Sequence, residues 1–428
     1  MSSDTIYALS SGRPPAAVSV IRVSGPQAHN AGRQIAGSLP DARQAAVRTL
    51  RDAEGGVLDD ALVIRFDEPA SATGENIVEF QCHGGRAVVD AVLSALGQVE
   101  GLRLAQPGEF TRRAFENGRI DLTEAEGLAD LIEAETETQR KAALAMAEGG
   151  LRRQVEQWQS ELLSLSARAE AAIDYVDEDD VGPGTASEIL KDAATLASEL
   201  SSWLERPRAE PLKDGVRVVV AGPPNAGKSS LINAIAGQER AIVTDVPGTT
   251  RDHIEVPLSL AGIPILLTDT AGLRETDELV ERIGVNRARS LAEGADVLVW
   301  LGEPADAPPH PRLVQVHPRS DLPEQSTAPS QSLPVSSLTG KGLKELLERV
   351  AEFANSVLPA EDAIALNRRQ AAHLVEALAE LKRAQQAQDV VLTAEHLRSA
   401  RMAFDRLTGR AGMDDVLDAL FRRFCLGK

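Results

Sequence analysis

The chain has little of what secreted and membrane-spanning proteins rely on. Only two of its 428 residues are cysteines, Cys82 and Cys425, which excludes a framework of disulfide bonds. No apolar run approaches the roughly 18 residues needed to cross a bilayer. The first four residues also lack the basic and apolar regions of a signal peptide. Together these absences predict a cytoplasmic protein with no membrane segment.

Aromatic and basic residues are also scarce. Aromatics make up 3% of the chain, so its cores have to be built mainly from Leu, Val, Ile and Ala. The formal net charge of −19 disfavours broad, non-specific binding of nucleic acid. The acidity is uneven, because residues 121–210 hold 21 acidic and 8 basic residues, whereas residues 1–120 hold 14 and 12. A polyanion would therefore meet the N-terminal part more readily, and an RNA delivered with a partner is compatible with this charge.

The spacing of apolar residues changes twice along the chain. Before residue 119, short apolar runs such as Ile77–Phe80 alternate with turn residues, which predicts a compact α+β domain. An apolar stripe with helical spacing then runs from Leu151 through Trp158 to Ala172, and the same spacing returns after residue 360. The middle alternates β-branched runs with helical segments, as in a mostly parallel sheet. We therefore expect four segments, with an α/β domain inserted into a split helical domain: residues 1–118, 119–212, 213–356 and 357–428.

The inserted segment contains the string Gly-Pro-Pro-Asn-Ala-Gly-Lys-Ser at residues 222–229. It follows the apolar run Val216–Ala221 and precedes the helical run Ser230–Ala236, which is the context that a phosphate-binding loop requires. Successive backbone N–H groups would wrap the phosphates, aided by the positive end of the helix. Lys228 would reach the β- and γ-phosphates, and Ser229 would bind Mg²⁺.

Three further segments follow in the order that GTPases use. The segment 248–252 supplies Thr250, which would complete the Mg²⁺ shell. Asp269 would hold Mg²⁺ through water, and the N–H of Gly272 would sense the γ-phosphate. Ser336–Leu338 would contact the base edge. Each segment alone is a weak signal, but their order and spacing together predict a GTP-binding, GTP-hydrolysing domain.

Two departures from the usual GTPase pattern stand out. Leu273 follows Gly272 where many GTPases place a glutamine that orients the attacking water, so that water has to be oriented by another group. The base-reading motif Asn-Lys-x-Asp is replaced by Pro318–Asp321, which keeps only the aspartate. We expect Asp321 still to read guanine and Arg319 to cover one face of the base.

Several motifs outside the inserted segment point to one family. They are Ile21–Gly25, Thr73–Glu75, His83–Gly85, Pro107–Phe115 with Asp121–Glu126, and the terminal Cys425–Lys428. On these motifs the chain resembles the tRNA-modification GTPases of the MnmE (TrmE) family over essentially its whole length. The resemblance implies an N-terminal α+β folate-binding domain that dimerises, a split helical-bundle domain and an inserted Ras-like GTPase domain with a mostly parallel sheet.

The resemblance also implies a reaction and its participants. A homodimer and a flavoprotein partner, MnmG, would together add a carboxymethylaminomethyl-type group at C5 of the wobble uridine (U34) of certain tRNAs. A tetrahydrofolate derivative would donate the one-carbon unit, Mg²⁺ and K⁺ would serve the GTPase, and FAD and NADH would belong to the partner.

Site residues carry over position by position. The implied folate ligands are Arg22, Glu79, Arg119 and Lys428, and the implied K⁺ ligands are Asn225, Thr244, Val246 and Thr249. Glu281 would orient water, Cys425 would be linked to the modification chemistry, and Lys228 would act in phosphoryl transfer. The Mg²⁺ ligands would be Ser229, Thr250 and Asp269. The GTP site as a whole would comprise Asn225, Ala226, Gly227, Lys228, Ser229, Ser230, Thr244, Asp245, Val246, Pro247, Gly248, Thr249, Thr250, Asp269, Thr270, Ala271, Gly272, Asp321, Ser336, Ser337 and Leu338.

Two other functions fit parts of the sequence. The chain could be a GTP-gated binding module such as a ribosome-assembly factor, but such a factor would have no use for the implied folate residues and the Cys425–Lys428 tail. It could also be a scaffold with a weakened GTPase, which the altered base-reading segment favours. The intact Lys228, Ser229, Thr250 and Asp269 argue against that scaffold.

Overall fold

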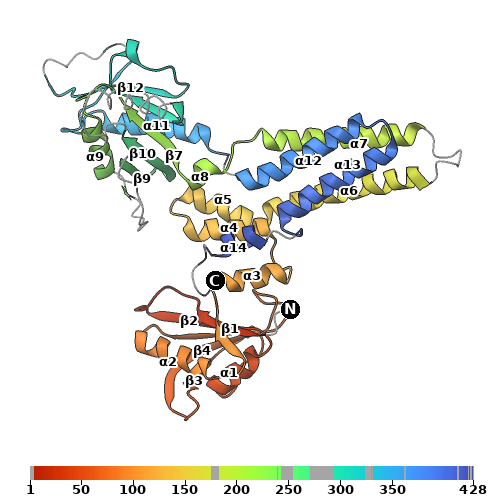
Figure 1. The fold of residues 1–428 in the computed structure, drawn as a ribbon. Helices are drawn as coiled ribbons and strands as arrows, with labels where there is room; N and C mark the ends of the chain where they lie inside the picture. Colours follow the sequence, from red (N-terminus) through yellow and green to blue (C-terminus); the bar gives the residue numbers. More distant parts are fainter. Residues whose placement is uncertain are drawn as a thin grey trace, which may run out of the picture. The chain divides into compact units, whose positions relative to one another are not determined.

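The computed structural model describes residues 4–174, 183–238, 240–241, 254–269, 293–322, 329, 331–360, 363–411, 414–422, 424 and 427. The chain divides into two compact units. The first unit comprises Met1–Ala129, Leu151–Val155 and Asp405–Lys428, and the second comprises Asp130–Gly150 and Glu156–Phe404. Two sheets and a set of long helices confirm the predicted multidomain fold (Figure 1). The domain limits expected at residues 118, 212 and 356 stay predictions.

A six-stranded sheet forms the centre of the first unit, with strand order β3-β4-β5-β2-β1-β6. Neighbouring strands are antiparallel except β1 and β6, which run parallel. The strands are β1 (Thr5–Leu9), β2 (Val18–Ser24), β3 (Ala45–Arg51), β4 (Val57–Phe66), β5 (Ile77–His83) and β6 (Leu102–Leu104). The helices are α1 (Ala28–Ala36), α2 (Arg86–Gly97), α3 (Glu109–Glu116), most of α4 (Leu122–Glu133) and α14 (Asp414–Phe421).

Alternation along β1 decides what covers each face of this sheet. Tyr7 joins a buried cluster with residues of α1 and α2, whereas its neighbour Ile6 joins Phe110 of α3. This is the period of two expected of a strand that is covered on both faces. Cys82 on β5 belongs to the first of these clusters and is 1% exposed, as expected of a core residue. Burial, together with the charge of Asp59, raises the pKa of its thiol to about 12.

Residues from the far end of the chain complete the first unit. Within the helical pattern predicted after residue 360, four apolar residues are buried against Leu122 and its neighbours on α4: Leu417, Leu420, Phe421 and Phe424. A glycine makes this packing possible. Gly108, directly before α3, has φ of +73°, and a Cβ there would lie 2.2 Å from the carbonyl oxygen of Phe421.

A seven-stranded sheet forms one part of the second unit, with strand order β13-β12-β11-β7-β10-β9-β8. Pairing is parallel from β13 to β10 and antiparallel between β10, β9 and β8, so the predicted mostly parallel sheet is confirmed. Its strands are β7 (Val216–Ala221), β8 (Arg240–Ala241), β9 (Ile254–Leu260), β10 (Ile263–Asp269), β11 (Val297–Trp300), β12 (Leu313–His317) and β13 (Leu333–Pro334). Its helices are α8 (Glu210–Lys213), α9 (Lys228–Gln238), the 3₁₀ helix η1 (Pro304–Asp306) and α11 (Leu343–Val357).

Long helices form the rest of the second unit and run side by side in Figure 1. They are α6 (Gly150–Asp174), α7 (Pro183–Leu204), α12 (Arg368–Gln386) and α13 (Val390–Thr408), and the shorter α5 (Glu137–Ala147) precedes them. Trp158 of α6 is fully buried, with its ring 5.2 Å from that of Trp203 and 5.9 Å from that of Phe404. Three of the scarce aromatics thus meet where three helices pack together, and the predicted one-sided stripes face one another.

Candidate functional site

The loop between β7 and α9 has the predicted strand–loop–helix arrangement. β7 ends at Ala221, and α9 begins at Lys228. Gly222 has φ of +151°, and a Cβ on it would lie 3.1 Å from the carbonyl of Leu301, directly after β11. Asn225 adopts a left-handed backbone with φ of +62°, which a non-glycine residue seldom does. The sequence therefore builds a tight turn that aims backbone N–H groups and a helix N-terminus at one point.

Lys228 is buried at this turn and is 7% exposed. Its ammonium donates to the backbone carbonyls of Gly222 and Pro223, each at 2.9 Å. Burial lowers the pKa of Lys228, and the nearby charge of Asp269 partly opposes that shift. The ammonium is thus held over the loop by neutral carbonyls, which an anionic ligand can replace.

Ser229 and Asp269 come together although 40 positions separate them. The hydroxyl of Ser229 donates to Oδ2 of Asp269 at 2.7 Å, and Asp269 is 1% exposed at the end of β10. A hydroxyl and a carboxylate side by side are the hard oxygen ligands that Mg²⁺ prefers beside nucleotide phosphates. The two described residues of the predicted Mg²⁺ set therefore fit that ion.

The predicted base-side residues lie after β12 and β13. Ser336 is fully buried, and its hydroxyl accepts from the N–H of Thr339 at 3.1 Å. Leu338 is 85% exposed. Asp321 is exposed, in a loop that is anchored where the N–H of Ser320 donates to the carbonyl of Val335 at 3.2 Å. An exposed carboxylate beside a fixed turn is open to a base from solvent.

Arg319 has a partner that the sequence did not predict. Its guanidinium donates from Nη2 to the carbonyl of Asn225 at 2.7 Å, so the base-side loop contacts the phosphate loop. Sequence patterns offered no direct signal for this contact, because the two residues are 94 positions apart and lie in irregular loops.

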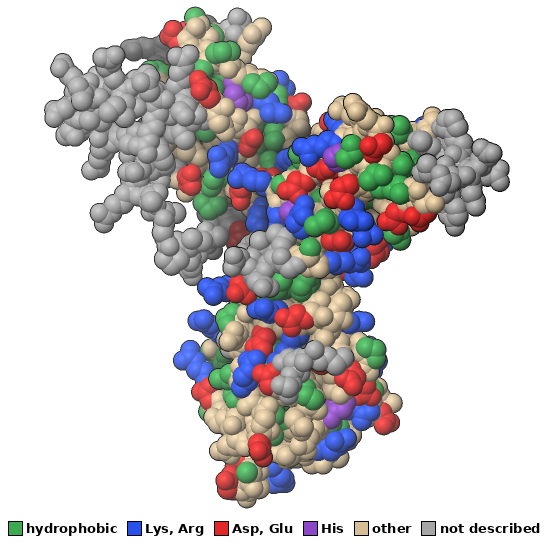
Figure 2. All heavy atoms as spheres, turned by 45° about the vertical axis from the view of Figure 1, so that its right-hand side comes forward, with side chains coloured by type: hydrophobic (Ala, Val, Ile, Leu, Met, Phe, Trp, Pro, Cys, Tyr) green, Lys and Arg blue, Asp and Glu red, His purple; other side chains and the backbone are tan. Residues whose placement is uncertain are grey.

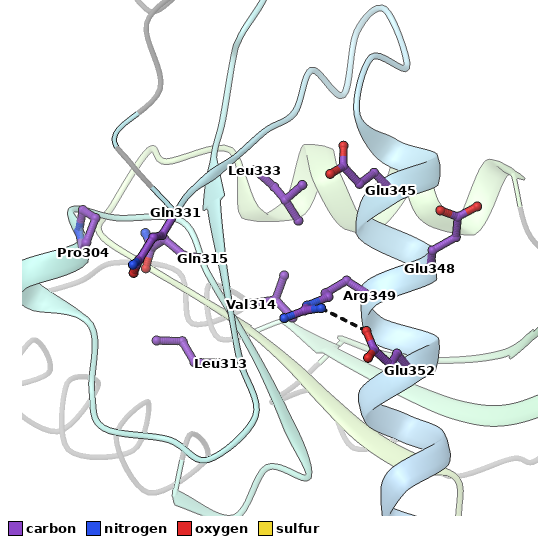
Figure 3. Close-up of a pocket in the computed structure, with 10 residues that line it drawn as sticks. All are labelled: Pro304, Leu313, Val314, Gln315, Gln331, Leu333, Glu345, Glu348, Arg349 and Glu352. Carbon is purple, nitrogen blue, oxygen red and sulfur yellow. Dashed lines mark hydrogen bonds and ion pairs between the residues drawn. The ribbon is translucent and has the colours of Figure 1, made fainter.

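A cavity of about 800 Å³ lies elsewhere on this sheet, and its described lining comes from η1, β12, the segment around β13 and α11. Figure 3 shows Glu345, Glu348 and Glu352 projecting from α11, with Arg349 paired to Glu352 at 3.0 Å. Three carboxylates repel phosphate groups. This cavity is therefore a poor site for the phosphates of a nucleotide.

The first unit contains a buried network of ion pairs. Arg113 of α3 is 3% exposed, and its guanidinium reaches Asp4 at 2.8 Å, Glu75 at 3.2 Å and Glu109 at 3.2 Å. Ser24 of β2 donates to Glu75 at 2.7 Å. Two of the family motifs, Thr73–Glu75 and Pro107–Phe115, thus meet in one network. Both motifs mark the family resemblance, but neither predicts this network from its own residues.

The predicted folate residues Arg22 and Glu79 face each other across β2 and β5. Nε and Nη2 of Arg22 lie 2.9 and 2.8 Å from Oε1 of Glu79, and the two side chains are 24% and 15% exposed. The guanidinium also lies 5.6 Å from the ring centre of Phe110. Arg119 is exposed directly after α3, and the structure records no contact that joins it to this pair.

The tail residue Gly427 lies against the end of β1. Its carbonyl accepts from the hydroxyl of Ser10 at 2.7 Å, and a Cβ on it would lie 1.9 Å from the carbonyl oxygen of Leu9. Leu9 pairs with Ile21, the neighbour of Arg22 on β2. The glycine of the tail motif is therefore required by close packing, and the tail reaches β1, the neighbour of the strand that carries Arg22.

Two family models match the chain. "GTP-binding protein TrmE N-terminus" matches residues 5–119, and "MnmE helical domain" matches residues 122–425. A "tRNA modification GTPase MnmE" from Erythrobacter litoralis (strain HTCC2594) is 53% identical over 99% of this chain and 100% of the relative. One from Novosphingobium aromaticivorans is 50% identical over 100% of both. The chain belongs to the MnmE family.

Membership of the MnmE family confirms the predicted GTPase and a role in tRNA modification. The G domain of the T. maritima FeoB iron transporter is also similar, at 26% identity over 32% of this chain and 98% of that chain. Its TM-score of 0.25 is too low to compare the folds. Among the described helices, none is both long enough and apolar enough to cross a membrane.

The remaining predicted MnmE-family site residues cannot be placed. The following lie outside the described residues: Thr244, Asp245, Val246, Pro247, Gly248, Thr249, Thr250, Thr270, Ala271, Gly272, Glu281, Cys425 and Lys428. The described members of the predicted set are the phosphate loop with Ser230, Asp269, the base-side residues, the Arg22–Glu79 pair and Arg119.

Proposed function

We propose that this chain couples GTP hydrolysis to modification of the wobble uridine of tRNA, as a cytoplasmic homodimer working with a flavoprotein of the MnmG type. The product would carry a carboxymethylaminomethyl-type group at C5. The proposal is carried by identity of about half over the full length with relatives named tRNA modification GTPases. Basic and acidic side chains are intermixed over the described part of the face in Figure 2, so a partner would help to hold the tRNA.

Nucleoside analysis of tRNA from cells that lack the protein tests this role. We expect the modified wobble uridine to disappear and to return when the wild-type gene is restored. A Lys228→Ala gene should fail to restore it. Wobble nucleosides that are unchanged in cells lacking the protein would overturn the proposal.

A monovalent cation is the second element of the proposal. Asn225 is the described member of the proposed K⁺ set, and it lies on the phosphate loop three residues before Lys228. A cation there would offset charge that develops on the phosphates during transfer. Glu281 would orient the attacking water, because Leu273 cannot do so.

Hydrolysis should therefore be faster in KCl than in NaCl, and Asn225→Ala should remove the difference. Asn233→Ala is the matched control, because Asn233 is exposed on α9. Glu281→Ala should slow turnover without weakening GTP binding, since a residue that acts mainly in the transition state affects kcat. Equal rates in both salts for the wild-type protein would exclude the cation site.

A reduced folate is the third element, bound through Arg22, Glu79, Arg119 and Lys428. The Arg22–Glu79 pair is partly exposed, so a ligand can reach both groups. A guanidinium suits the glutamate tail of folate, and a carboxylate can accept from the amino and ring N–H groups of the pterin. Gly427 lies beside β1, the neighbour of the strand that carries Arg22, and Lys428 follows it in the sequence.

Calorimetry with formyl-tetrahydrofolate tests the folate site on the full-length protein. Arg22→Ala and Glu79→Gln should each weaken binding by about tenfold or more, the scale of one lost hydrogen bond to a charged group. Arg33→Ala, on the exposed face of α1, should leave binding unchanged. Folate assignment fails if the wild-type protein shows no binding.

Guanine selection is the fourth element, and we assign it to Asp321. One carboxylate can accept from both N1–H and the 2-amino group of guanine, whereas adenine offers neither donor. Asp321→Asn should shift competition from GTP towards XTP, and Asp306→Asn on η1 should not. If ATP competes as well as GTP with the wild-type protein, Asp321 does not read the base.

A further inference from the structure

One cavity of the second unit shares none of its described lining residues with the predicted GTP site. It measures about 800 Å³ and lies between α11, η1 and one edge of the seven-stranded sheet (Figure 3). We propose that it is a docking groove for an extended segment of a partner protein, with lysine or arginine at alternate positions, which joins the sheet as an added strand. This inference is independent of the tRNA, cation, folate and guanine proposals.

Residues 313–315 of β12 offer an unpaired strand edge to this cavity. On one side they pair with residues 298–300 of β11. On the other side β13 pairs only with Val316 and His317, and no other described strand extends that pairing. An unpaired edge presents backbone N–H and C=O groups, which can form hydrogen bonds with an extended peptide as in a sheet.

The connection from β11 to β12 leaves this edge thinly covered. It spans residues 301–312, and its only described helix is the three-residue η1, where parallel strands are usually joined by a longer α-helix. Leu313 and Gln315 are only partly buried on that face. Val314 points to the other face, where it is 2% exposed in the core cluster that includes residues of α11. The groove therefore has a closed side at α11 and a more open side at η1.

Helix α11 gives the groove its charge. Glu345, Glu348 and Glu352 lie three and four positions apart, so they share one face of the helix. Arg349 pairs with Glu352 at 3.0 Å, which leaves Glu345 and Glu348 as the carboxylates that a ligand can use. The nearest cation to Glu348 is Lys344 at 3.8 Å, and it is 91% exposed, so its effect is small. Cationic side chains of a partner would complement this charge.

A second feature of the cavity points to a ligand with hydrogen-bond donors. Nε2 of Gln315 donates to the carbonyl of Gly302 at 2.6 Å, whereas Oε1 is buried and has no hydrogen-bond partner among the described groups. A buried acceptor without a partner is costly, and an N–H group that enters the cavity would remove this cost. A basic peptide brings donors both in its backbone and in its side chains.

An added strand would meet the two sides of the groove with alternate side chains. Side chains two positions apart point to the same face and are separated by about 7 Å. On the α11 side, two basic residues would therefore lie along the stretch from Glu345 to Glu352, which is about 10 Å long on the helix axis. On the η1 side, apolar residues would cover Leu313. The groove thus selects a segment that alternates basic and apolar residues.

Fluorescence anisotropy with the full-length protein tests the groove. The probe is a labelled eight-residue peptide that alternates lysine and valine, and we expect the wild-type protein to bind it. Glu345→Gln combined with Glu348→Gln should weaken binding about three- to tenfold, the scale of two exposed ion pairs. Lys344→Gln, on the same helix, is the matched control and should not weaken binding. Neither variant should change GTP hydrolysis. No binding by the wild-type protein, or equal binding by the double variant, would overturn the proposal.

Two further probes separate strand addition from attraction between charges alone. One carries N-methyl groups on every valine and the other on every lysine, so all charges remain but the N–H donors of one edge are lost. An added strand uses one edge, so one of these probes should bind about tenfold or more weakly, and the other should match the parent peptide. Amide exchange at residues 313–315 should also slow when the parent peptide binds. Equal binding of the two methylated probes, or unchanged exchange there, would exclude strand addition.

Discussion

Lys228 and Arg113 are both buried cations, 7% and 3% exposed, yet they are held in opposite ways. Lys228 contacts two neutral carbonyls of its own loop. Arg113 contacts the carboxylates of Asp4, Glu75 and Glu109. The first cation keeps most of its charge available to a ligand, whereas the second is neutralised by the fold.

The difference shows how to separate binding sites from structural networks among buried charges. A buried ammonium with neutral partners is costly, and burial lowers the pKa of Lys228 accordingly. That cost is recovered when an anion binds. A guanidinium surrounded by carboxylates has no such deficit, so it stabilises the arrangement of α3 on the sheet and leaves little for a ligand.

The largest effect should come from Lys228→Ala. We expect GTP hydrolysis to fall by about a thousandfold or more, because the charge that offsets the phosphates is removed. The melting profile should change little, since the two carbonyls can bind water instead. Lys344→Ala, a fully solvated lysine on α11, is the control for hydrolysis. Near-normal hydrolysis in Lys228→Ala would show that the charge of Lys228 does not serve the ligand, and the proposed difference from Arg113 would fail.

Arg113→Met should act on stability and not on hydrolysis. Arg103 still pairs with Asp4 and Glu109 in this variant, but the buried Glu75 loses the cation that it contacts, which costs about 3–5 kcal/mol. Amide exchange in β2 and α3 measures this loss in the first unit. Tryptophan fluorescence would not detect it, because all three tryptophans lie in the second unit. Arg112→Met, whose partly exposed side chain pairs with Glu116 and Asp418, should cost less than about 1 kcal/mol. Equal costs at both positions would mean that the network adds no stability.

The smallest effect should be a pH dependence of GTP binding. The pKa of Lys228 is lowered in the free protein and should rise when phosphates bind, because they favour the charged ammonium. The contribution of Lys228 to affinity is then complete below the free pKa and is lost as the pH rises from there through the higher pKa of the complex. Calorimetry in buffers of different ionisation enthalpy should show net proton uptake that grows with pH in the alkaline range. Proton release there would contradict the assignment.

Elements with a regular period could be predicted from the sequence, and so could sites that lie within one short segment. The stripe from Leu151 through Trp158 is buried as expected, and the loop before Lys228 lies between a strand and a helix. The spacing of apolar residues indicates which face of an element is buried, and a short motif fixes the relative positions of its own residues.

Contacts between distant irregular segments could not be predicted. The bond from Arg319 to Asn225 and the pair of Arg113 with Glu75 join residues 94 and 38 positions apart. Each depends on where two loops or elements end after the sheet has formed. The periodicity of buried residues contains no information on such partners. Two charged motifs in one predicted domain made an ion pair between them possible, but did not identify Arg113 and Glu75 as the partners.

The packing of Gly427 against Leu9 has a consequence for the order in which the protein is made. Ser10 and Gly427 are 417 positions apart, and the core around Leu122 also needs Phe421 and Phe424. A ribosome adds about 5–20 residues per second, so the first strand waits tens of seconds for its last neighbours. During that time the second unit can fold between the two halves of the first. Synthesis of the first unit therefore begins first, and its folding is completed last. Bulky groups added directly after Gly427 would disturb β1, the first strand to be made.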